Sequence, residues 1–525
     1  MKILICDPIE QRCVDILSGE GFAVELKPGL TPDQLEAVIG DYDALIVRSR
    51  TRVTADILRC ADRLKVVGRA GAGVDNIDVE AATRKGIIVM NTPGGNTIST
   101  AEHTISLLLA LARNIPQAHT SLKQGTWERK TFIGTELFGK TIGIIGLGKV
   151  GREVAHRCLS FGMIVVGYDP VLSIEVALKL GIELADLEDV LRRSDFITVH
   201  TPLTEDTRNL LNEQTIGKCK KGVRIINCAR GGIVDEKALL RALESGYVAG
   251  AALDVFVEEP PTNRRLIRHE KLVVTPHLGA STEEAQEKVA ILIAEQLADV
   301  LKGRGFSGVV NAVAIQQAMK EEIRPYVTLS EKLGSLVAQL MHGKLRSLTL
   351  TYGGELLQQA AEILRAATLK GILGHLLSEP VNYVNAPMLA RELGLIVNEK
   401  KERDSGNYTH LLKAEYETDR ERRKFWGAVF GASTVRLVNI DGFHFEVRPE
   451  GYLLFYSNID RPGMLAKVGS VLAKANINIA GVALGRNVVG ERALTVMNVD
   501  SDIPDTVIRR IASIEGVSEA KLVRL

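Results

Sequence analysis

Three glycines with a cofactor-binding spacing, Gly146, Gly148 and Gly151, follow the apolar run at 141–145 and open a helical pattern at 152–159. In this strand–turn–helix context the first glycine permits a tight turn. The second lets the backbone approach a pyrophosphate, and the third allows close helix–strand packing. The helix start adds free N–H groups and partial positive charge for phosphates. Turn glycines without a ligand are the alternative, but the context favours a dinucleotide site.

Asp169 ends the next apolar run, at 164–168, and lies 18 residues beyond Gly151. A carboxylate at this place can accept hydrogen bonds from both ribose hydroxyls and repels a 2′-phosphate. Asp169 therefore predicts NAD rather than NADP as the cofactor. A helix-capping role is the alternative for this residue.

Three further segments carry a family resemblance: NCARGGIVDEKAL at 227–239, ALDVFVEEPP at 252–261 and VTPHLGAST at 274–282. They resemble signature regions of the D-2-hydroxyacid dehydrogenases, and they occur in the expected order and spacing. The resemblance covers about the first 300 residues. It implies two α/β lobes with a cleft and an NAD-dependent oxidation of a small hydroxy acid.

The resemblance implies a catalytic role for His277, Glu259 and Arg230. His277 would take the hydroxyl proton and return it in the reverse reaction, since imidazole titrates near neutral pH. Glu259 would accept a hydrogen bond from the other ring nitrogen; its neighbour Glu258 is also a carboxylate, and the family pattern selects Glu259. Arg230 would hold the substrate carboxylate and polarise the carbonyl oxygen. Each residue alone also has an ordinary structural explanation.

The resemblance also implies further cofactor contacts. Cys228 has no flanking base, so we interpret it as a packing residue or as backbone beside the cofactor. The residues expected to line the cofactor besides the glycines and Asp169 are Ala72, Lys149, Val150, Thr201, Cys228, Ala229, Asp254, Gly279 and Ala280.

The first lobe carries the arginine-rich segments VRSRTRVT and GRAGAGVDNID. Guanidinium groups bind phosphate in a planar fork, as a phosphorylated substrate requires. Similar segments face the substrate in the D-3-phosphoglycerate dehydrogenases of this family, although Ala72 departs mildly from their pattern. Arg50 and Arg52 are equally consistent with phosphate contacts and with solvated surface charge. The expected substrate contacts are Arg48, Ser49, Arg69, Gly71, Gly73 and Asn96.

The elements that position these residues alternate between apolar runs and helical patterns, which is typical of βαβ units and a parallel sheet. Long helical patterns at 100–113 and 283–302 are placed to connect two lobes. We therefore expect a flavodoxin-like substrate lobe from 1–98 and 286–310, with a Rossmann NAD domain at 99–285 between its two parts.

Two more domains are expected beyond a Gly-rich linker at 303–311. An α+β region at 311–448 resembles the intervening domain of long-form D-3-phosphoglycerate dehydrogenases. Its charged stretches at 399–405 and 418–424 read as solvated connections. A β-α-β-β-α-β pattern at 449–525 has the ferredoxin-like order and resembles an ACT domain.

The ACT resemblance implies an amino-acid site and feedback by L-serine. Asp460 is expected to bind the ligand ammonium, and Asn458 and Asn478 its polar ends. The alternative is that this module only pairs subunits. The family implies a homo-oligomer.

Bulk composition excludes several other classes of protein. Lys plus Arg number 65 against 64 Asp plus Glu, so a net charge of +1 predicts neither nucleic-acid nor membrane binding. The six cysteines are scattered without zinc-like spacing, which predicts reduced thiols and no metal site. The first ten residues read as a strand rather than a signal peptide. We expect a cytoplasmic enzyme.

The expected reaction is reversible oxidation of D-3-phosphoglycerate to 3-phosphohydroxypyruvate, the first step of L-serine synthesis. One alternative is a glyoxylate or hydroxypyruvate reductase, which typically lacks the C-terminal domains. Others are an NADH-sensing, corepressor-like binding protein and an amino-acid sensor on a degenerate enzyme. The presence of Arg230, Glu259 and His277 together argues against degeneracy.

Overall fold

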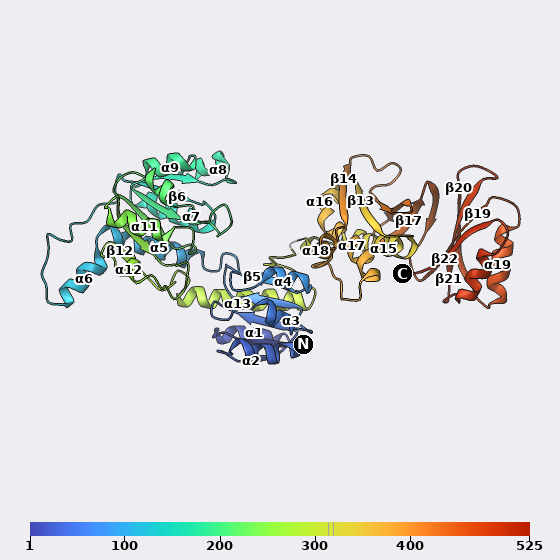
Figure 1. Ribbon diagram of the computed structural model, residues 1–525, viewed down its shortest axis with the longest axis horizontal. Helices are drawn as coiled ribbons and strands as arrows, with labels where there is room; N and C mark the ends of the chain where they lie inside the picture. The colour runs from blue at the N-terminus through green and yellow to red at the C-terminus, as the bar shows by residue number, and fades with distance from the viewer. Residues whose placement is uncertain (313, 319) are drawn as a thin grey trace. The chain divides into compact units, whose positions relative to one another are not determined.

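The computed structural model describes residues 1–312, 314–318 and 320–525. The chain forms two compact units (Figure 1). The first contains Met1–Pro8, Cys13–Asn91 and Ile293–Leu525, and the second contains Ile9–Arg12 and Thr92–Leu292. Within the described residues, no helix is sufficiently long and apolar to span a bilayer.

The first unit begins with a five-stranded parallel sheet in the order β2-β1-β3-β4-β5. This is the flavodoxin-like order, and it reverses direction between β1 and β3. The strands are β1 (Lys2–Ile5), β2 (Ala23–Leu26), β3 (Ala44–Val47), β4 (Val66–Arg69) and β5 (Ile88–Asn91). The helices are α1 (Gln11–Gly19), α2 (Pro32–Val38), α3 (Ala55–Arg59) and α4 (Val79–Arg84), with a 3₁₀ turn at Ile39–Asp41.

The chain returns to this lobe through α13 (Glu283–Leu301). Ile293 and Leu297 lie against Gly68 of β4, where a Cβ would meet the Ile293 side chain at 3.0 Å. Beyond the helix, Val310 N donates to Val89 O at 2.8 Å, and the Asn311 side chain also hydrogen-bonds this edge of the sheet. The second half of the expected linker is therefore attached to the lobe.

The second unit contains a seven-stranded parallel sheet in the order β12-β11-β10-β9-β6-β7-β8. Ile144 and Ile145 of β6 belong to different hydrophobic clusters, because successive strand residues face opposite sides of a sheet. One cluster joins the sheet to α5 and α7, and the other joins it to α9, α10 and α11. Helices therefore cover both faces, as an all-parallel sheet requires.

The elements of this unit have the following bounds. The strands are β6 (Thr141–Ile145), β7 (Ile164–Tyr168), β8 (Glu183–Leu184), β9 (Phe196–Val199), β10 (Val223–Asn227), β11 (Val248–Leu253) and β12 (Leu272–Val274). The helices are α5 (Thr97–Ala112), α6 (Ile115–Lys123), α7 (Lys149–Ser160), α8 (Ile174–Lys179), α9 (Leu187–Arg193), α10 (Glu213–Gly217), α11 (Glu236–Glu244) and α12 (Arg264–Ile267).

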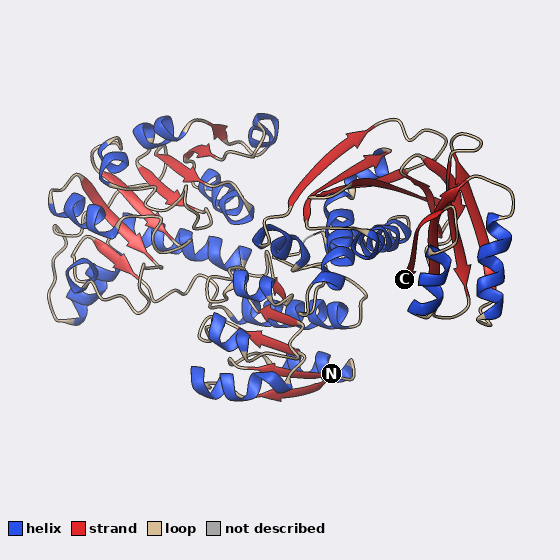
Figure 2. Ribbon diagram, turned by 45° about the vertical axis from the view of Figure 1, so that its right-hand side comes forward, coloured by secondary structure: helices blue, strands red, loops and turns tan. Residues whose placement is uncertain are grey.

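The intervening region of the first unit has a six-stranded sheet in the order β14-β13-β15-β16-β17-β18 (Figure 2). Its strands are β13 (Leu345–Gly353), β14 (Ile396–Glu402), β15 (Leu411–Thr418), β16 (Arg422–Phe430), β17 (Thr434–Ile440) and β18 (Phe443–Val447). Its helices are α14 (Ile315–Ala318), α15 (Arg324–Leu340), α16 (Glu355–Gln359), α17 (Ala361–Leu376) and α18 (Ala386–Glu392).

The two charged stretches of this region are only in part the solvated connections that the sequence predicts: 403–405 and 419–421 lie between strands, but the rest is strand. Residues 399–402 belong to β14, an edge strand with mostly exposed side chains, and 422–424 begin β16. Edge strands commonly carry charged residues, which prevent pairing with other chains.

The C-terminal module has a four-stranded antiparallel sheet in the order β20-β21-β19-β22. Its elements are β19 (Tyr452–Ile459), α19 (Met464–Lys474), β20 (Ile479–Arg486), β21 (Arg492–Val499), α20 (Asp505–Ala512) and β22 (Val517–Arg524). This confirms the expected ferredoxin-like fold.

Candidate active site

Three neighbouring strands of the second unit end at one level. Asn227 of β10 pairs with Leu253 of β11, which pairs with Val274 of β12. The loops that follow carry Arg230, Glu259 and His277 respectively. Because open parallel sheets place ligands outside the carboxyl ends of their strands, all three loops begin at the ligand-binding edge.

His277 and Glu259 form a direct pair: Nδ1 of the imidazole lies 2.8 Å from Oε2 of the carboxylate. The other carboxylate oxygen, Oε1, accepts from Phe256 N at 3.2 Å. The carboxylate is thus held from both sides and fixes the imidazole tautomer with a proton on Nδ1. Nε2 is left to exchange a proton with a substrate.

Glu259 is ionised in this arrangement. Burial opposes its ionisation, but the hydrogen bond and charge of His277, with the Phe256 amide, outweigh burial and lower the pKa of the carboxyl. An ionised carboxylate at this distance can stabilise an imidazolium, which is what a general base in the position of His277 would require. The neighbouring Glu258 instead accepts from Thr262 Oγ1 at 2.8 Å.

Buried Asp254 holds the backbone turn at His277, although its side chain contacts neither the His277 ring nor the Glu259 carboxylate. The carbonyl of Asp254 accepts His277 N at 2.8 Å, and its carboxylate accepts Leu278 N at 2.7 Å and Gly279 N at 2.9 Å. His277 itself has a φ of 55°, in the left-handed region that non-glycine residues rarely adopt. The Asp254 contacts are the restraints that hold this conformation.

Helix α5 contributes His103 to the same scaffold, a residue that the sequence does not single out. Its Nε2 lies 3.2 Å from Asp254 Oδ1 and 3.1 Å from Thr275 Oγ1, and Thr275 also donates to Asp254 at 2.6 Å. Burial opposes ionisation of Asp254, but these hydrogen bonds outweigh it and lower its pKa. The resemblance assigns Asp254 to the cofactor, whereas the contacts described here are with the loop that carries His277.

The loop of Arg230 packs against the loop of Glu259 at a glycine. A Cβ on Gly231 would meet Phe256 O at 1.9 Å, and this backbone contact leaves no room for a side chain. Asn227 donates to Arg230 O at 2.9 Å, and Arg230 Nη1 donates to Ala229 O at 2.7 Å. Arg230 therefore precedes a glycine that packs against Phe256, and the amide of Phe256 hydrogen-bonds Glu259.

The glycine-rich turn has the geometry that a pyrophosphate requires. Gly146 has a φ of 93°, and a Cβ on Gly151 would lie 2.0 Å from Gly146 O. Gly148 is the N-cap of α7, and a Cβ there would meet nothing within 4 Å. Thr201, after β9, has a buried hydroxyl without a hydrogen-bond partner in the described structure. The residues present therefore fit a dinucleotide.

Asp169 connects the glycine-rich turn to the next loop. Its Oδ2 accepts Leu147 N at 2.8 Å, and its Oδ1 accepts Val171 N and Leu172 N at 2.9 Å. Burial opposes its ionisation, but the three amides outweigh burial and lower its pKa. Oδ1 already accepts two hydrogen bonds, but Oδ2 accepts only one and can accept a second, so a ribose contact stays open at Oδ2.

The remaining expected cofactor residues have varied surroundings. Lys149 Nζ lies 3.3 Å from Pro93 O at the start of α7. Cys228 is buried, and burial raises the pKa of its thiol to about 12, which agrees with a packing role. Gly279 O accepts from Thr100 at 3.2 Å. Val150, Ala229 and Ala280 are half-buried in the second unit, and Ala72 belongs to the first unit.

The expected substrate contacts divide between the units. Asn96, the N-cap residue of α5, belongs to the second unit, and the others belong to the first. Arg48 N donates to Asp7 at 2.5 Å. The Arg69 guanidinium lies over Gly71, where a Cβ would meet Nη1 at 2.1 Å. Ser49 is exposed and Gly73 is half-buried.

Comparison with known proteins agrees with this architecture. Residues 105–279 match the NAD-binding domain of D-isomer specific 2-hydroxyacid dehydrogenases. Residues 322–441 match the D-3-phosphoglycerate dehydrogenase intervening domain, and 452–516 match the ACT domain. The D-3-phosphoglycerate dehydrogenase of Methanocaldococcus jannaschii is 43% identical over 526 residues, covering 100% of both chains. The human D-3-phosphoglycerate dehydrogenase is 45% identical, with 96% of each chain covered.

The chain belongs to the D-3-phosphoglycerate dehydrogenase family. A D-lactate dehydrogenase from Aquifex aeolicus, solved with NAD and lactic acid, is a structural relative with a TM-score of 0.53 and 27% identity. The match covers 58% of this chain and 96% of that one. Like other members of the family, the chain is an NAD-dependent dehydrogenase with an α/β fold, as the sequence predicts.

The family's ACT module carries the expected regulatory residues, but one chain does not bring them together. Asn458 and Asp460 lie at the end of β19 that pairs with Ala493, whereas Asn478 precedes the β20 end that pairs with Val499. These ends are separated by about 20 Å along β21, at about 3.4 Å per residue. A single module therefore does not place all three residues around one small ligand.

The same residues also have partners within the module. Asp460 accepts from Gly490 N at 3.3 Å and pairs with Arg486 at 3.0 Å, and these contacts lower its pKa. Asn478 donates to Asp500 at 2.6 Å. The Oδ1 of buried Asn458 has no hydrogen-bond partner in the described structure, and it is the one of the three with an unused buried acceptor.

Proposed function

We propose that the chain catalyses the reversible oxidation of D-3-phosphoglycerate to 3-phosphohydroxypyruvate with NAD, the first step of L-serine synthesis. The observation that carries the chemistry is the 2.8 Å pair of His277 and Glu259, beside the loop of Arg230. Similarity to D-3-phosphoglycerate dehydrogenases over the full chain supports the choice of substrate.

The chain's own residues supply the proton transfer and the orientation. His277 Nε2 takes the proton of the substrate hydroxyl, and Glu259 stabilises the resulting imidazolium through Nδ1. Arg230 binds the substrate carboxylate and polarises the oxygen that becomes a carbonyl. NAD, when bound, accepts the hydride that leaves the same carbon. In the reverse direction His277 returns the proton.

The substrate phosphate requires cationic partners outside this trio. We assign that role to Arg48 and Arg69 of the first unit, with Ser49 and the Gly71–Gly73 backbone beside them. Support comes from the place of these residues at the carboxyl ends of β3 and β4, where ligands bind in open parallel sheets: Arg48 follows β3, and Arg69 is the last residue of β4.

A steady-state assay of NADH oxidation tests this function. The purified chain is supplied with 3-phosphohydroxypyruvate, hydroxypyruvate or glyoxylate at equal concentrations. We expect kcat/KM to be highest for the phosphorylated acid. Equal or higher values for glyoxylate or hydroxypyruvate would support a reductase of those acids instead. Absence of turnover with all three, while NADH still binds, would support an NADH-sensing protein.

The ACT domain supports feedback regulation, and we assign L-serine as the effector, with a cytoplasmic homo-oligomer as the working form. Because one module separates Asn478 from Asn458 and Asp460, a site that uses all three requires more than one copy of the module. The same assay with added L-serine tests this, together with analytical ultracentrifugation. Unchanged activity in L-serine would contradict the regulatory assignment and leave the catalytic one intact.

A further inference from the structure

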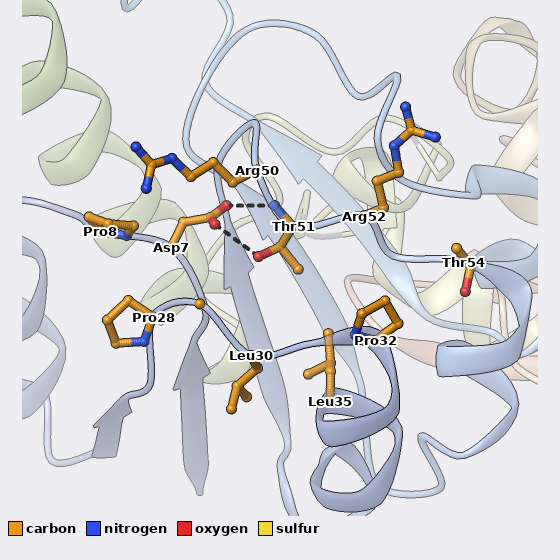
Figure 3. Close-up of a pocket in the computed structure, with 11 residues that line it drawn as sticks. Asp7, Pro8, Pro28, Leu30, Pro32, Leu35, Arg50, Thr51, Arg52 and Thr54 are labelled. Atoms are coloured by element: carbon orange, nitrogen blue, oxygen red, sulfur yellow. Dashed lines mark hydrogen bonds between the residues drawn. The ribbon is translucent and has the colours of Figure 1, made fainter. Parts of the chain in front are cut away.

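The first unit contains a cavity of about 510 Å³ at the carboxyl edge of its five-stranded sheet. Its lining comes from the loops that follow β1, β2 and β3 and from the start of α2 (Figure 3). Since the strand order reverses between β1 and β3, this is the topological switch point of the sheet. Ligands of doubly wound sheets bind at such points.

The floor of this cavity is apolar. Pro28, Leu30, Pro32 and Leu35 lie together on one side of it, as Figure 3 shows, and Leu35 is buried within the lobe. A cavity of this size falls in the range that holds a small organic molecule, and apolar lining with few polar groups is typical of such sites.

The rim is cationic. Arg50 and Arg52 extend on either side of Thr51, away from Leu30 and Leu35 (Figure 3). Neither guanidinium has a hydrogen bond or an ion pair within the described part of the chain. Most other arginines of this lobe are paired, as Arg59 is with Asp56 at 2.5 Å. Two arginines without an ion pair in the described residues, beside an apolar floor, fit an anion with an apolar body.

The acidic residue in the lining, Asp7, forms no ion pair with Arg50 or Arg52 within the described residues, since its oxygens accept hydrogen bonds from the loop that carries them. Asp7 accepts Arg48 N at 2.5 Å, Thr51 N at 3.3 Å and Thr51 Oγ1 at 2.9 Å. Asp7 is 3% exposed and is therefore turned into the loop rather than toward a ligand. These bonds fix the loop that presents Arg50 and Arg52.

We propose that this cavity is a second ligand site, distinct from the substrate contacts, which takes a small organic anion: a phosphate monoester or a carboxylate with an apolar group. The apolar group lies on the Leu30–Leu35 floor, and the anionic group is bound at the rim by Arg50 and Arg52. The site does not depend on the reaction that the enzyme catalyses.

Isothermal titration calorimetry of the full-length protein tests the proposal with three probes: phenyl phosphate, benzoate and inorganic phosphate. We expect saturable binding of phenyl phosphate or benzoate, tighter than that of inorganic phosphate because the floor contributes apolar contact. Comparison of the first two decides between the phosphate and carboxylate forms of the ligand. NADH and D-3-phosphoglycerate, which do not react with each other, are present throughout to occupy the catalytic site.

Variants distinguish binding in this cavity from binding to other surface arginines and from binding at the substrate site. Arg50→Ala with Arg52→Ala is expected to weaken binding of the organic anion at least about tenfold. Arg59→Ala, which removes an exposed arginine outside the cavity, is the matched control and is expected to bind as the unaltered protein does. Leu30→Trp, which fills the floor and keeps both arginines, is expected to remove the preference over inorganic phosphate.

Any one of four results would overturn the proposal. Equal binding by the double arginine variant and by Arg59→Ala, or no saturable binding of either organic anion, would show that the rim does not hold anions. A rise of more than about threefold in KM for 3-phosphohydroxypyruvate in the double variant, or displacement of phenyl phosphate by that substrate, would show that the arginines belong to the substrate site.

Discussion

The backbone carbonyl of Asp254 accepts the amide of His277 at 2.8 Å, while the Asp254 side chain accepts the two amides that follow. Asp254, the buried residue that follows β11, thus fixes the backbone of His277, while Glu259 fixes the His277 ring through a 2.8 Å contact. Two different residues therefore restrain His277: Asp254 holds its backbone, and Glu259 holds its ring and tautomer.

Glu259→Gln removes the carboxylate that orients the His277 ring. We expect kcat to fall by about 10²–10⁴, the range seen when an orienting carboxylate becomes an amide that favours the wrong tautomer. The KM for NADH is expected to stay within about threefold, since this residue lies outside the glycine-rich turn. Steady-state kinetics with 3-phosphohydroxypyruvate measure both quantities. Glu258→Gln, the adjacent carboxylate bonded to Thr262, is the control and should change kcat less than about twofold.

Arg230→Lys keeps a positive charge but removes the planar fork that binds a carboxylate at two points. We expect kcat/KM to fall at least about tenfold, the equivalent of one charge-assisted hydrogen bond. Arg241→Lys, which alters a surface ion pair with Glu213, serves as the control and should leave kcat/KM nearly unchanged. Equal kinetics in both variants would remove Arg230 from the substrate site.

Gly231→Ala tests the contact between the loops of Arg230 and Glu259. An added Cβ would lie 1.9 Å from Phe256 O, a backbone atom that cannot rotate away. The loops must separate, so we expect a loss of about 10²-fold in kcat/KM, as a misplacement of about 1 Å can cause. Gly217→Ala, whose Cβ would meet nothing within 4 Å, should retain activity and provides the control. Full activity in Gly231→Ala would show that the loops act independently.

Asp254→Asn tests the scaffold through the pH dependence of stability. The pKa of Asp254 lies below its ordinary value, so between the folded and unfolded pKa the unfolded chain binds more protons. Its contribution is complete above the ordinary Asp pKa of about 3.9 and is lost as pH falls through the lower folded value. We therefore expect Asp254→Asn to lower Tm at pH 7.

The difference in Tm between the two proteins should shrink as pH falls below about 4, because Asp254 is then protonated in the unfolded chain, and at still lower pH in the folded chain too. Differential scanning calorimetry from pH 3 to pH 7 measures it. A Tm difference that does not change with pH would indicate that the substitution acts through packing alone.

The sequence predicts the parts of the fold that are buried. The strands that follow continuous apolar runs, such as Ala44–Val47 and Phe196–Val199, are correctly predicted because parallel strands covered on both faces are apolar throughout. Two of the strands that the sequence does not predict are edges of the parallel sheets. Ala23–Leu26 is at most half-buried, and Glu183–Leu184 has only two residues, so neither gives an apolar run.

In the active site, too, some features follow from the sequence and others do not. Motif spacing predicts Gly146 and Asp169, and the family resemblance implies Glu259 and His277, because these roles depend on residue type at a fixed place in a loop. It does not predict the part played by His103, which is far from Asp254 in the chain and meets it only after α5 packs on the sheet. Backbone hydrogen bonds, such as that from His277 N to Asp254 O, do not depend on residue type, so the sequence does not predict them.

The central claim is that Glu259 acts only through His277, and a double-mutant cycle on kcat tests it most directly. His277→Gln, Glu259→Gln and the double variant are compared with the unaltered enzyme under saturating NADH and 3-phosphohydroxypyruvate. If the two residues form one unit, the double variant loses no more activity than His277→Gln alone. Losses that multiply in the double variant would show that Glu259 works independently of the imidazole, which would contradict the mechanism.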